Sequence, residues 1–276
     1  MRAGRPDYTF GDTPLAARRL ELLGAVLDPS TRAFLAKAAP TSCSVALDLG
    51  CGPGVSTRLV SEVTGASSTI GVDTSEPFVT HAEGRRAVGV SFVQHDATVM
   101  PLPGAPADLI TCRLLLAHVP DPVATVRTWA TQLAPRGRLL VEEMEWIDVP
   151  HPVLAAYETV VLDLVTSRGA PMYAGPAVGA VDGDQGWRRI ANSVRTVTVA
   201  VPTAARIYAM NLTTWRDDPH IRARHDPDHL DDLARDLAVL AASTSTDEIT
   251  WGVRQVAYER DASARPADGG PAGQRS

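Results

Sequence analysis

Asp48 is followed by three glycines at alternate positions, Gly50, Gly52 and Gly54, in the segment ALDLGCGPGVSTRLV (46–60). An apolar run precedes these glycines and a helical pattern follows them. Glycine lets a ligand approach the main chain, and the amides at the start of the next helix would point toward that ligand. A tight turn alone needs one or two glycines, so the spacing favours a binding loop.

The position of the third glycine helps to select the ligand. A dinucleotide-binding turn has the pattern GxGxxG, and its third glycine would fall at position 55, which is Val55. A dinucleotide-dependent oxidoreductase is therefore a disfavoured alternative. An acidic residue followed by three alternate glycines is the pattern that remains to be explained.

Alternating strands and helices must position this loop. Short apolar runs predict strands at 44–50, 68–73, 90–96, 108–113 and 137–145. Helical patterns lie between them at about 55–64, at about 75–87 and from Pro120 onward. Five β-α units in about 100 residues predict a doubly wound, mostly parallel α/β sheet.

The regions that flank this core are mainly helical. Thr13 with Pro14 and Asp28 with Pro29 each resemble a cap followed by the first residue of a helix, so two helices are expected at 1–43. Beyond residue 146 we expect a helix in 151–168, a Gly/Pro-rich loop at 169–186, and a short helix plus a strand in 187–201. Further helices are expected near 203–212 and 227–241, and a last strand at 248–260.

The predicted fold class is therefore a Rossmann-like α/β fold with a seven-stranded sheet. Its predicted parts are a helical lid (1–43), a ligand-binding core (44–146), a region that completes the sheet and inserts helices between the late strands (147–260), and a disordered tail (261–276).

Composition excludes several classes of function. The net charge is −6 and no basic run occurs, which argues against nucleic acid as a partner. No apolar run reaches the roughly 18 to 20 residues of a membrane span, and the N-terminus does not read as a secretory signal. Three widely spaced cysteines form no disulfide framework, so a reducing cytoplasm is expected. A homodimer is left open.

The glycine loop is the first of several motifs that occur in order. They are DLGCGPG (48–54), IGVDTS (70–75), FVQHDAT (92–98), ADLITCRLLLAHVPDP (107–122) and LAPRGRLLVEE (133–143). Together they resemble the class I methyltransferases that use S-adenosylmethionine (SAM), and YTFGDTPLAARRLELL (8–23) resembles the leader of such enzymes. The pair GCGPG and HVPDP resembles the bacterial small-molecule branch, which includes enzymes of natural-product and ubiquinone biosynthesis.

The resemblance implies SAM as cofactor and transfer of its methyl group to a small organic substrate, in specialised metabolism. Two alternatives keep the SAM pocket: an enzyme with a non-methylating reaction such as cyclisation, and a non-catalytic SAM-binding module.

The resemblance also implies a set of cofactor-binding residues. Asp73 would accept hydrogen bonds from the ribose hydroxyls, with Thr74 beside it, although it could also cap a helix. Asp96 would accept from the adenine amino group and the Ala97 amide would meet a ring nitrogen; a loop cap is the alternative for Asp96. The loop itself would contribute Gly50, Cys51, Gly52 and Gly54.

Other cofactor contacts have open alternatives. Asp48 would act indirectly, orienting loop amides or the amino group of the methionine moiety. Arg113 would contact the ligand's carboxylate or pair with an acidic neighbour. In the leader, Tyr8, Arg19 and Phe10 would fold over the methionine end of the cofactor. The alternative is a surface helix with solvated arginines, in which Arg18 could be the one that points inward.

Because SAM brings its own electrophile, the protein need supply only orientation, a nucleophile in line and a dry pocket. His118 is a candidate base, with a structural role in its loop as the favoured alternative. Glu143 and Glu145 are further candidates, unless they pair with an arginine such as Arg138.

The substrate is expected to bind among the late insertions. Tyr173 is a candidate there, in a region that also contains Trp146, Tyr157, Met172 and Trp215, any of which could be core. His225 and His229 have the i, i+4 spacing of metal ligands. However, Asp226-Pro227 resembles a helix start, and no third ligand is fixed by spacing, so no metal is expected.

Overall fold

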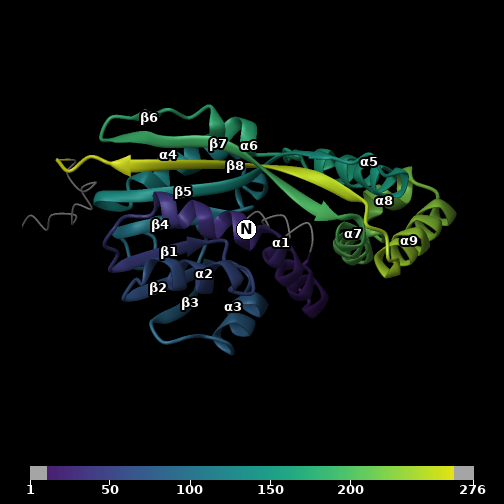
Figure 1. Ribbon diagram of the computed structural model, residues 1–276, viewed down its shortest axis with the longest axis horizontal. Coiled ribbons are helices and arrows are strands. Elements are labelled where there is room, and N and C mark those ends of the chain that lie inside the picture. The colour runs from purple at the N-terminus through teal and green to yellow at the C-terminus, as the bar shows by residue number, and fades with distance from the viewer. Residues whose placement is uncertain (1–10, 264–276) are drawn as a thin grey trace, which may run out of the picture.

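The computed structural model describes residues 11–263, and an eight-stranded sheet lies at its centre in the order β3–β2–β1–β4–β5–β8–β7–β6 (Figure 1). The strands are β1 (Val45–Leu49), β2 (Ser68–Asp73), β3 (Val90–Gln94), β4 (Ala107–Arg113), β5 (Leu133–Asp148), β6 (Gly183–Asp184), β7 (Trp187–Ala200) and β8 (Glu248–Arg260). Strands β3, β2, β1, β4 and β5 are parallel, whereas β8, β7 and β6 pair in antiparallel fashion.

The predicted doubly wound, mostly parallel α/β fold is therefore confirmed. The two-residue strand β6 adds an edge strand to the seven that were expected. Strand order reverses between β1 and β4, and in such sheets the ligand crevice lies at the carboxyl ends of the strands beside this reversal. The glycine loop follows β1 directly, so it lies at this crevice.

Ten helical segments accompany the sheet within the described residues. They are α1 (Pro14–Ala38), α2 (Val55–Thr64), α3 (Glu76–Glu83), the 3-10 helix η1 (Leu116–His118), α4 (Pro122–Ala130), α5 (Pro152–Ser167), α6 (Gly175–Gly179), α7 (Val201–Trp215), α8 (Pro219–Arg224) and α9 (Pro227–Ala242).

The two faces of the sheet bury alternate residues of the same strands, as a strand's period of two requires. Leu139 and Val141 of β5 pack on one face with Trp129 of α4. Leu140, between them in sequence, packs on the other face with Phe34 of α1 and Leu59 of α2. Both faces of the parallel region are thus covered by helices.

Helices α5, α7, α8 and α9 gather at one end of the sheet, beyond the end of β7 (Figure 1). Their shared core includes Tyr157 of α5 and Tyr208 of α7, whose rings stack with centroids 4.2 Å apart. Trp251 of β8 is buried in the same core. This helical cap is therefore continuous with the antiparallel end of the sheet.

The N-terminal segment differs from the prediction of two helices. A single helix, α1, runs from Pro14 to Ala38 and contains Pro29. Proline has no amide hydrogen and removes one hydrogen bond from a helix interior. Burial on both sides of Pro29 stabilises the helix: Leu27 lies in the core of the helical cap and Leu35 in the core beneath the sheet. Thr13 caps α1 as expected, accepting from the Ala16 amide.

The segment 187–201 also differs from the prediction, because the expected short helix is absent from it. Strand β7 occupies Trp187–Ala200 and pairs with β8 along this whole length. Its first half, WRRIANSV, has no strict alternation, and the partner strand β8 determines its conformation. Helix α8 was not predicted, whereas Asp226 caps α9 as expected.

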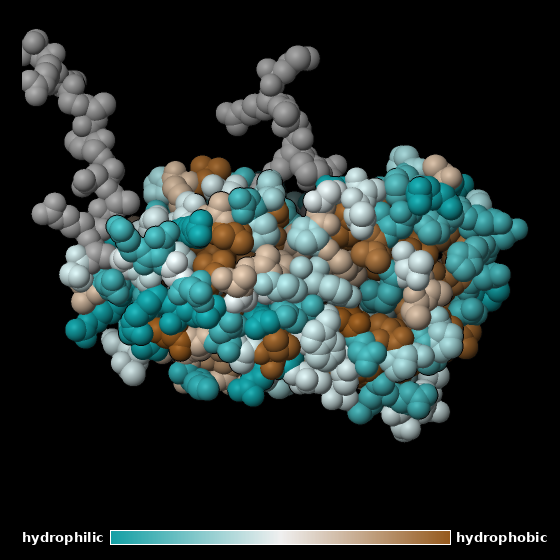
Figure 2. Space-filling model, turned by 90° about the horizontal axis from the view of Figure 1, so that it is seen from above, coloured by the Kyte–Doolittle hydropathy of each residue, from teal (hydrophilic) through white to brown (hydrophobic). Residues whose placement is uncertain are grey.

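On the face seen in Figure 2, hydrophobic residues form separate small patches among hydrophilic ones. Among residues 11–263, none of the helices combines the length and apolar character needed to cross a membrane. The disordered tail was predicted at 261–276, and its residues 264–276 lie outside the described part of the chain.

Candidate cofactor and active site

The glycine loop joins β1 to α2 in a conformation that favours glycine. Gly50, Gly52 and Gly54 all have positive φ angles, of 69°, 51° and 82°. The amides of Gly50 and Cys51 donate to the Val72 carbonyl of β2, at 2.8 and 3.1 Å, and this fixes the loop against the neighbouring strand. The loop is therefore held rigidly at the carboxyl end of β1.

A cavity of about 340 Å³ opens beside this loop and is lined by Gly50, Cys51 and Gly52. Gly54 does not line it. A Cβ at Gly54 would lie 2.7 Å from the ring of Phe92, so its missing side chain serves packing. Burial raises the pKa of the Cys51 thiol well above its usual value, and the nearby Asp73 carboxylate adds to this, so the thiol stays protonated.

Asp73 links the loop to the start of α3. Its Oδ2 accepts from the Gly52 amide at 2.8 Å and its Oδ1 accepts from the Ser75 amide at 2.9 Å. Burial raises the pKa of this carboxyl, and the amide hydrogen bonds oppose that rise. Asp73 and Thr74 line the cavity. The cap of α3 is Ser75, whose hydroxyl accepts from the Phe78 amide.

Asp48 lies behind the loop and is 1% exposed. Its carboxylate accepts from the hydroxyls of Ser56 and Thr57 at 2.7 Å each, and from Thr111 at 3.1 Å. Burial raises its pKa. Because Asp48 ties the first turn of α2 to β4, its place in the structure fits the orientation of the loop rather than direct contact with a ligand.

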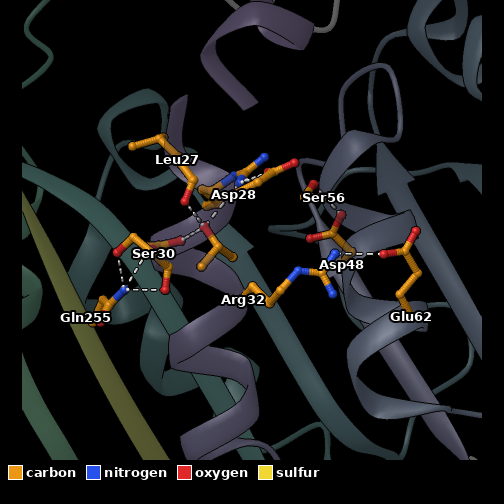
Figure 3. A network of polar contacts seen from close by, with 11 residues as sticks. Leu27, Asp28, Ser30, Arg32, Asp48, Ser56, Glu62 and Gln255 are labelled. Carbon is orange, nitrogen blue, oxygen red and sulfur yellow. Dashed lines mark hydrogen bonds and ion pairs between the residues drawn. The ribbon is translucent and has the colours of Figure 1, made fainter. Parts of the chain in front are cut away.

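Arg113 pairs with an acidic neighbour, one of the two roles left open for it. Its Nη1 donates to Asp28 Oδ1 at 2.9 Å and to Thr31 Oγ1 at 3.1 Å. Thr31 donates in turn to Glu142, which also accepts from Gln255. Figure 3 shows Asp28 of α1 and, beside Gln255 of β8, Ser30 of the same helix, whose hydroxyl accepts from Gln255 Nε2 at 3.0 Å. Arg113 also lines the cavity, so this network attaches α1 to the end of β4 at the crevice.

Arg19 is the inward arginine of the leader. It is 3% exposed, lines the cavity, and donates from Nη1 to Asn211 Oδ1 of α7 at 2.6 Å, whereas Arg18 is exposed. Tyr8 and Phe10 lie outside the described residues.

Asp96 and Ala97 follow β3 and are not among the residues that line the cavity. Asp96 accepts from the Thr98 amide and hydroxyl, at 2.8 and 2.7 Å. The Ala97 carbonyl accepts from Trp129 Nε1 at 2.7 Å. These contacts leave the adenine-binding role of the two residues as a prediction.

His118, Glu143 and Tyr173 all line the cavity. Burial, together with the charge of Arg19, lowers the pKa of His118 to about 4, so the imidazole is neutral at pH 7. Its amide donates to the Leu115 carbonyl at 2.9 Å, within the turn that begins η1. Burial also raises the pKa of the Tyr173 hydroxyl to about 12, and the carboxylate of Glu158 adds to this effect.

Glu143 serves the same turn. Its Oε1 accepts from the amides of Leu115 and Leu116, at 2.8 and 2.6 Å, and burial raises its pKa to about 8. Pairing with an arginine was the alternative role for Glu143 and Glu145; it holds for Glu145, although the arginine is Arg254 and not Arg138. Arg138 pairs with Glu259 of β8, and Glu145 pairs with Arg254, because β5 and β8 bring these residues side by side.

The sequence singled out only some of the residues that line the far half of the cavity. Tyr157 and Met172 were expected in this region, and Tyr208, Asn211, Trp251 and Glu158 join them there. A helical stripe could have identified Glu158, because Glu158, Val161 and Val165 of α5 have the spacing i, i+3, i+7. Trp215 is buried in the core of the helical cap, while Trp146 is 37% exposed.

One of the two histidines that have the spacing of metal ligands, His225, belongs to a cluster of charged side chains around Asp163. His225 Nε2 lies 3.1 Å from Asp163 Oδ2, and Arg224 donates to the same carboxylate. His229 is exposed on α9. Among residues 11–263, no group of three or more His, Cys, Asp or Glu is arranged to hold a metal ion.

Known proteins resemble this chain over the same crevice-forming core. Residues 47–141 match a family model described as a methyltransferase domain. A trans-aconitate 2-methyltransferase of Methylobacterium nodulans is 36% identical over 105 residues, which are 38% of this chain and 40% of that protein. A ubiquinone biosynthesis O-methyltransferase of Coxiella burnetii is 34% identical over 99 residues, 34% of this chain and 40% of that protein.

A solved structure extends the likeness to the whole fold. It belongs to a Bacillus halodurans protein provisionally assigned as a methyltransferase, with a TM-score of 0.54 and 15% identity over 84% of this chain and 98% of that one. At this identity the likeness concerns the fold alone. The matched segment spans 40% of the length of the two curated relatives, so their substrates do not transfer directly to this chain.

Proposed function

We propose that this chain, whose residues 47–141 form a class I SAM-dependent methyltransferase domain, transfers a methyl group from SAM to a small organic molecule. One observation carries the proposal: the cavity beside the glycine loop and Asp73 continues into an aromatic region lined by Tyr157, Tyr208 and Trp251. A cofactor and a small acceptor molecule would thus share one enclosed space.

The residues at the first part of this cavity fit the cofactor. Gly50 and Gly52 line the cavity, and so does Asp73, whose carboxylate oxygens have lone pairs beyond those used by the Gly52 and Ser75 amides. When bound, SAM supplies the electrophilic methyl group. The chain's own residues then hold the cofactor, orient the acceptor and keep water away.

A base on the protein is required only if the acceptor must lose a proton as it attacks. His118 is neutral at pH 7 and lines the cavity, so it can accept a proton. Its low pKa makes it a weak base, and its place in the turn at Leu115 supports the structural role that we favour for it.

A ligand-binding measurement tests the proposal first. S-adenosylhomocysteine (SAH) should raise the Tm, because a ligand that binds only the folded state stabilises it, whereas NAD and NADP should not. The reverse ranking would support the oxidoreductase alternative and end the proposal.

Product analysis separates the remaining alternatives. Small amines, alcohols and carboxylic acids are incubated with the protein and SAM, and products are examined by mass spectrometry. A gain of one methylene identifies methylation, and an isomeric product of unchanged mass identifies a reaction such as cyclisation. SAH binding without any turnover would favour a non-catalytic SAM-binding module.

The setting of the reaction belongs to the same proposal. Relatives named for methylation of trans-aconitate and for ubiquinone biosynthesis support a small-molecule acceptor. Cys43, Cys51 and Cys112 are free thiols, which supports a location in the reducing cytoplasm. Specialised metabolism remains our prediction, to be tested by the identity of the acceptor.

A further inference from the structure

Glu158 introduces an acidic group into the far half of the cavity. It lies on α5 and lines the cavity together with its helix neighbours Tyr157, Val161 and Val165. Among residues 11–263, no arginine, lysine or histidine forms an ion pair with its carboxylate. Arg19, a cation that also lines the cavity, donates to Asn211.

A carboxylate among the apolar side chains of this cavity, such as Val161 and Val165, is unfavourable without a countercharge or hydrogen bonds. Transfer of a charged group from water into an apolar site costs free energy unless a countercharge or hydrogen bonds compensate. Burial accordingly raises the pKa of Glu158, and the Tyr208 hydroxyl opposes this only in part. That hydroxyl is near the carboxylate but does not reach hydrogen-bond geometry.

Three tyrosines that line the cavity are affected by this carboxylate. The charge of Glu158 raises the pKa of Tyr157, Tyr173 and Tyr208, after burial in each case, which places all three phenols within its field. Tyr157 and Tyr208 stack with an interplanar angle of 16°. Aromatic faces attract cations, and the attraction is larger where water is excluded.

The same half of the cavity contains unused hydrogen-bond donors. The hydroxyls of Tyr157 and Tyr208 and the indole nitrogen of Trp251 are buried and have no hydrogen-bond partner among the described residues. These side chains are 2%, 4% and 2% exposed. The polar atoms themselves have almost no accessible surface, so they lie in the packed wall of the cavity, and the groups that a ligand can reach there are the Glu158 carboxylate and the aromatic rings.

We propose that Glu158 is a specificity-determining residue that binds a cationic amino group of the substrate, so that the substrate is a small amine with an apolar or aromatic body. This inference rests on the proposed methyltransferase function and names its substrate class. An ammonium group pairs with the carboxylate and lies against the tyrosine faces.

Two other classes of substrate fit less well. A carboxylate-bearing acceptor would be repelled by Glu158, and a neutral alcohol would leave the partly buried carboxylate without a countercharge. The three classes can therefore be ranked by affinity. The site determines which charge is recognised and leaves open which atom accepts the methyl group.

The test compares matched probes in calorimetry at pH 7.5 with saturating SAH. Two amines, 2-phenylethylamine and tyramine, are compared with the alcohols of the same skeletons, 2-phenylethanol and tyrosol, and with 3-phenylpropanoate. We expect the amines to bind about ten- to a hundredfold more tightly than the alcohols, as for a hydrogen bond to a charged group. The carboxylate should bind most weakly. Amines that bind no better than their alcohols would overturn the inference.

Variants locate the effect. Glu158→Gln keeps the shape and removes the charge, and should abolish the preference for amines while leaving SAH affinity unchanged. Asp163→Asn removes a charge from the same helix at a surface carboxylate paired with Arg224, and should keep the preference. A preference that survives Glu158→Gln would also overturn the inference.

The failures of the two proposals are distinguishable. If SAH does not bind the wild-type protein, the proposed function fails. If SAH binds normally and the amines show no advantage, only the role of Glu158 fails. The comparison of probes on the wild-type protein decides the question even if Glu158→Gln does not fold.

Discussion

The two halves of the cavity are built in different ways. In the half where we propose that SAM binds (the cofactor half), the loop residues Gly50 to Gly52 and Asp73 come from the ends of two adjacent strands, and most of their hydrogen bonds are made with backbone groups. In the far half, where we propose that the substrate binds (the substrate half), Glu158, Tyr208 and Trp251 come from α5, α7 and β8, and several of their polar groups are unpaired.

This difference separates a preorganised site from one completed by its ligand. The cofactor half has hydrogen bonds that hold it in place in the free protein. The far half contains an unpaired charge, Glu158, whose free-energy cost a cationic ligand can remove, and buried hydroxyls and an indole nitrogen without partners. The contrast predicts that substitutions in the first half act on SAH affinity, and that substitutions in the second act on substrate choice and on the stability of the free protein.

The largest effect is expected at Gly52. Gly52→Val places a branched side chain at a φ of 51°, with its Cβ 3.3 Å from Leu20 and at the cavity wall. It should abolish the rise in Tm that SAH causes. Gly65→Val is the control, because Gly65 has a similar φ of 61° but no neighbour within 4 Å of the added Cβ.

Both valine variants should lose about 1 to 2 kcal/mol of stability through the left-handed backbone. Only Gly52→Val should lose the response to SAH. A wild-type response in that variant would show that the cofactor does not approach the loop.

Asp73 should have the next largest effect. Asp73→Ala removes the carboxylate that lines the cavity and holds the Gly52 amide, and should weaken SAH binding by about 1.5 to 3 kcal/mol. Calorimetry measures the change. Asp121→Ala is the control, since Asp121 caps α4 by accepting from the Ala124 amide and lies outside the cavity lining. It should lower the Tm and leave SAH affinity unchanged; a wild-type affinity for Asp73→Ala would assign the ribose contact to another residue.

The sequence places Gly52 and Asp73 at the crevice for a physical reason, while their contacts with the cofactor stay predictions. The glycine loop follows β1 and Asp73 ends β2, so each lies in a short motif at the end of a strand. Parallel strands bring their carboxyl ends to the same edge of the sheet. The spacing of the motifs along the sequence is therefore enough to place Gly52 and Asp73 at this edge of the sheet.

The substrate half was harder to predict, because no local pattern brings its residues together. Tyr208 and Trp251 meet Glu158 only through the packing of α5, α7 and the long β7–β8 pair. Pro29 shows the same limitation at the level of secondary structure, since tertiary burial continues α1 across a residue that local rules place at a helix start.

His118 lies in the turn between the halves and should show a smaller effect that depends on pH. Its pKa of about 4 is below the value of 6.5 of the unfolded chain, so the unfolded state binds the proton first and stability falls as pH falls below 6.5. His118→Gln should remove about 2 kcal/mol of the decline in the free energy of unfolding between pH 7 and pH 5. Urea unfolding at both pH values measures it, with His229→Gln on the surface as control.

The pH dependence of the activity of His118→Gln tests the other candidate role of His118, that of a base. If His118 only supports the turn, the activity that remains should keep the wild-type dependence on pH between pH 6 and pH 9. A folded variant that binds SAH normally but loses a limb of that profile would identify His118 as the base.

The smallest expected effect is a change in the free energy of unfolding that differs in sign between a buried tyrosine with an unpaired hydroxyl and one with a paired hydroxyl. Tyr157 in the substrate half has an unpaired hydroxyl, whereas the Tyr258 hydroxyl, equally buried, donates to the Val178 carbonyl at 3.2 Å. Removal of an unsatisfied buried group relieves its desolvation cost, and removal of a satisfied one leaves its partner unpaired. Tyr157→Phe should therefore raise the free energy of unfolding of the free protein by about 1 kcal/mol, and Tyr258→Phe should lower it by about the same amount.

Urea denaturation without ligand measures both variants, and SAH affinity should stay at the wild-type value in each. The opposite signs are the informative result, because the two changes remove the same atom from equally buried rings. If Tyr157→Phe destabilises the protein as Tyr258→Phe does, the Tyr157 hydroxyl is already satisfied in the free protein. The substrate half would then be as preorganised as the cofactor half, and the contrast between them would not hold.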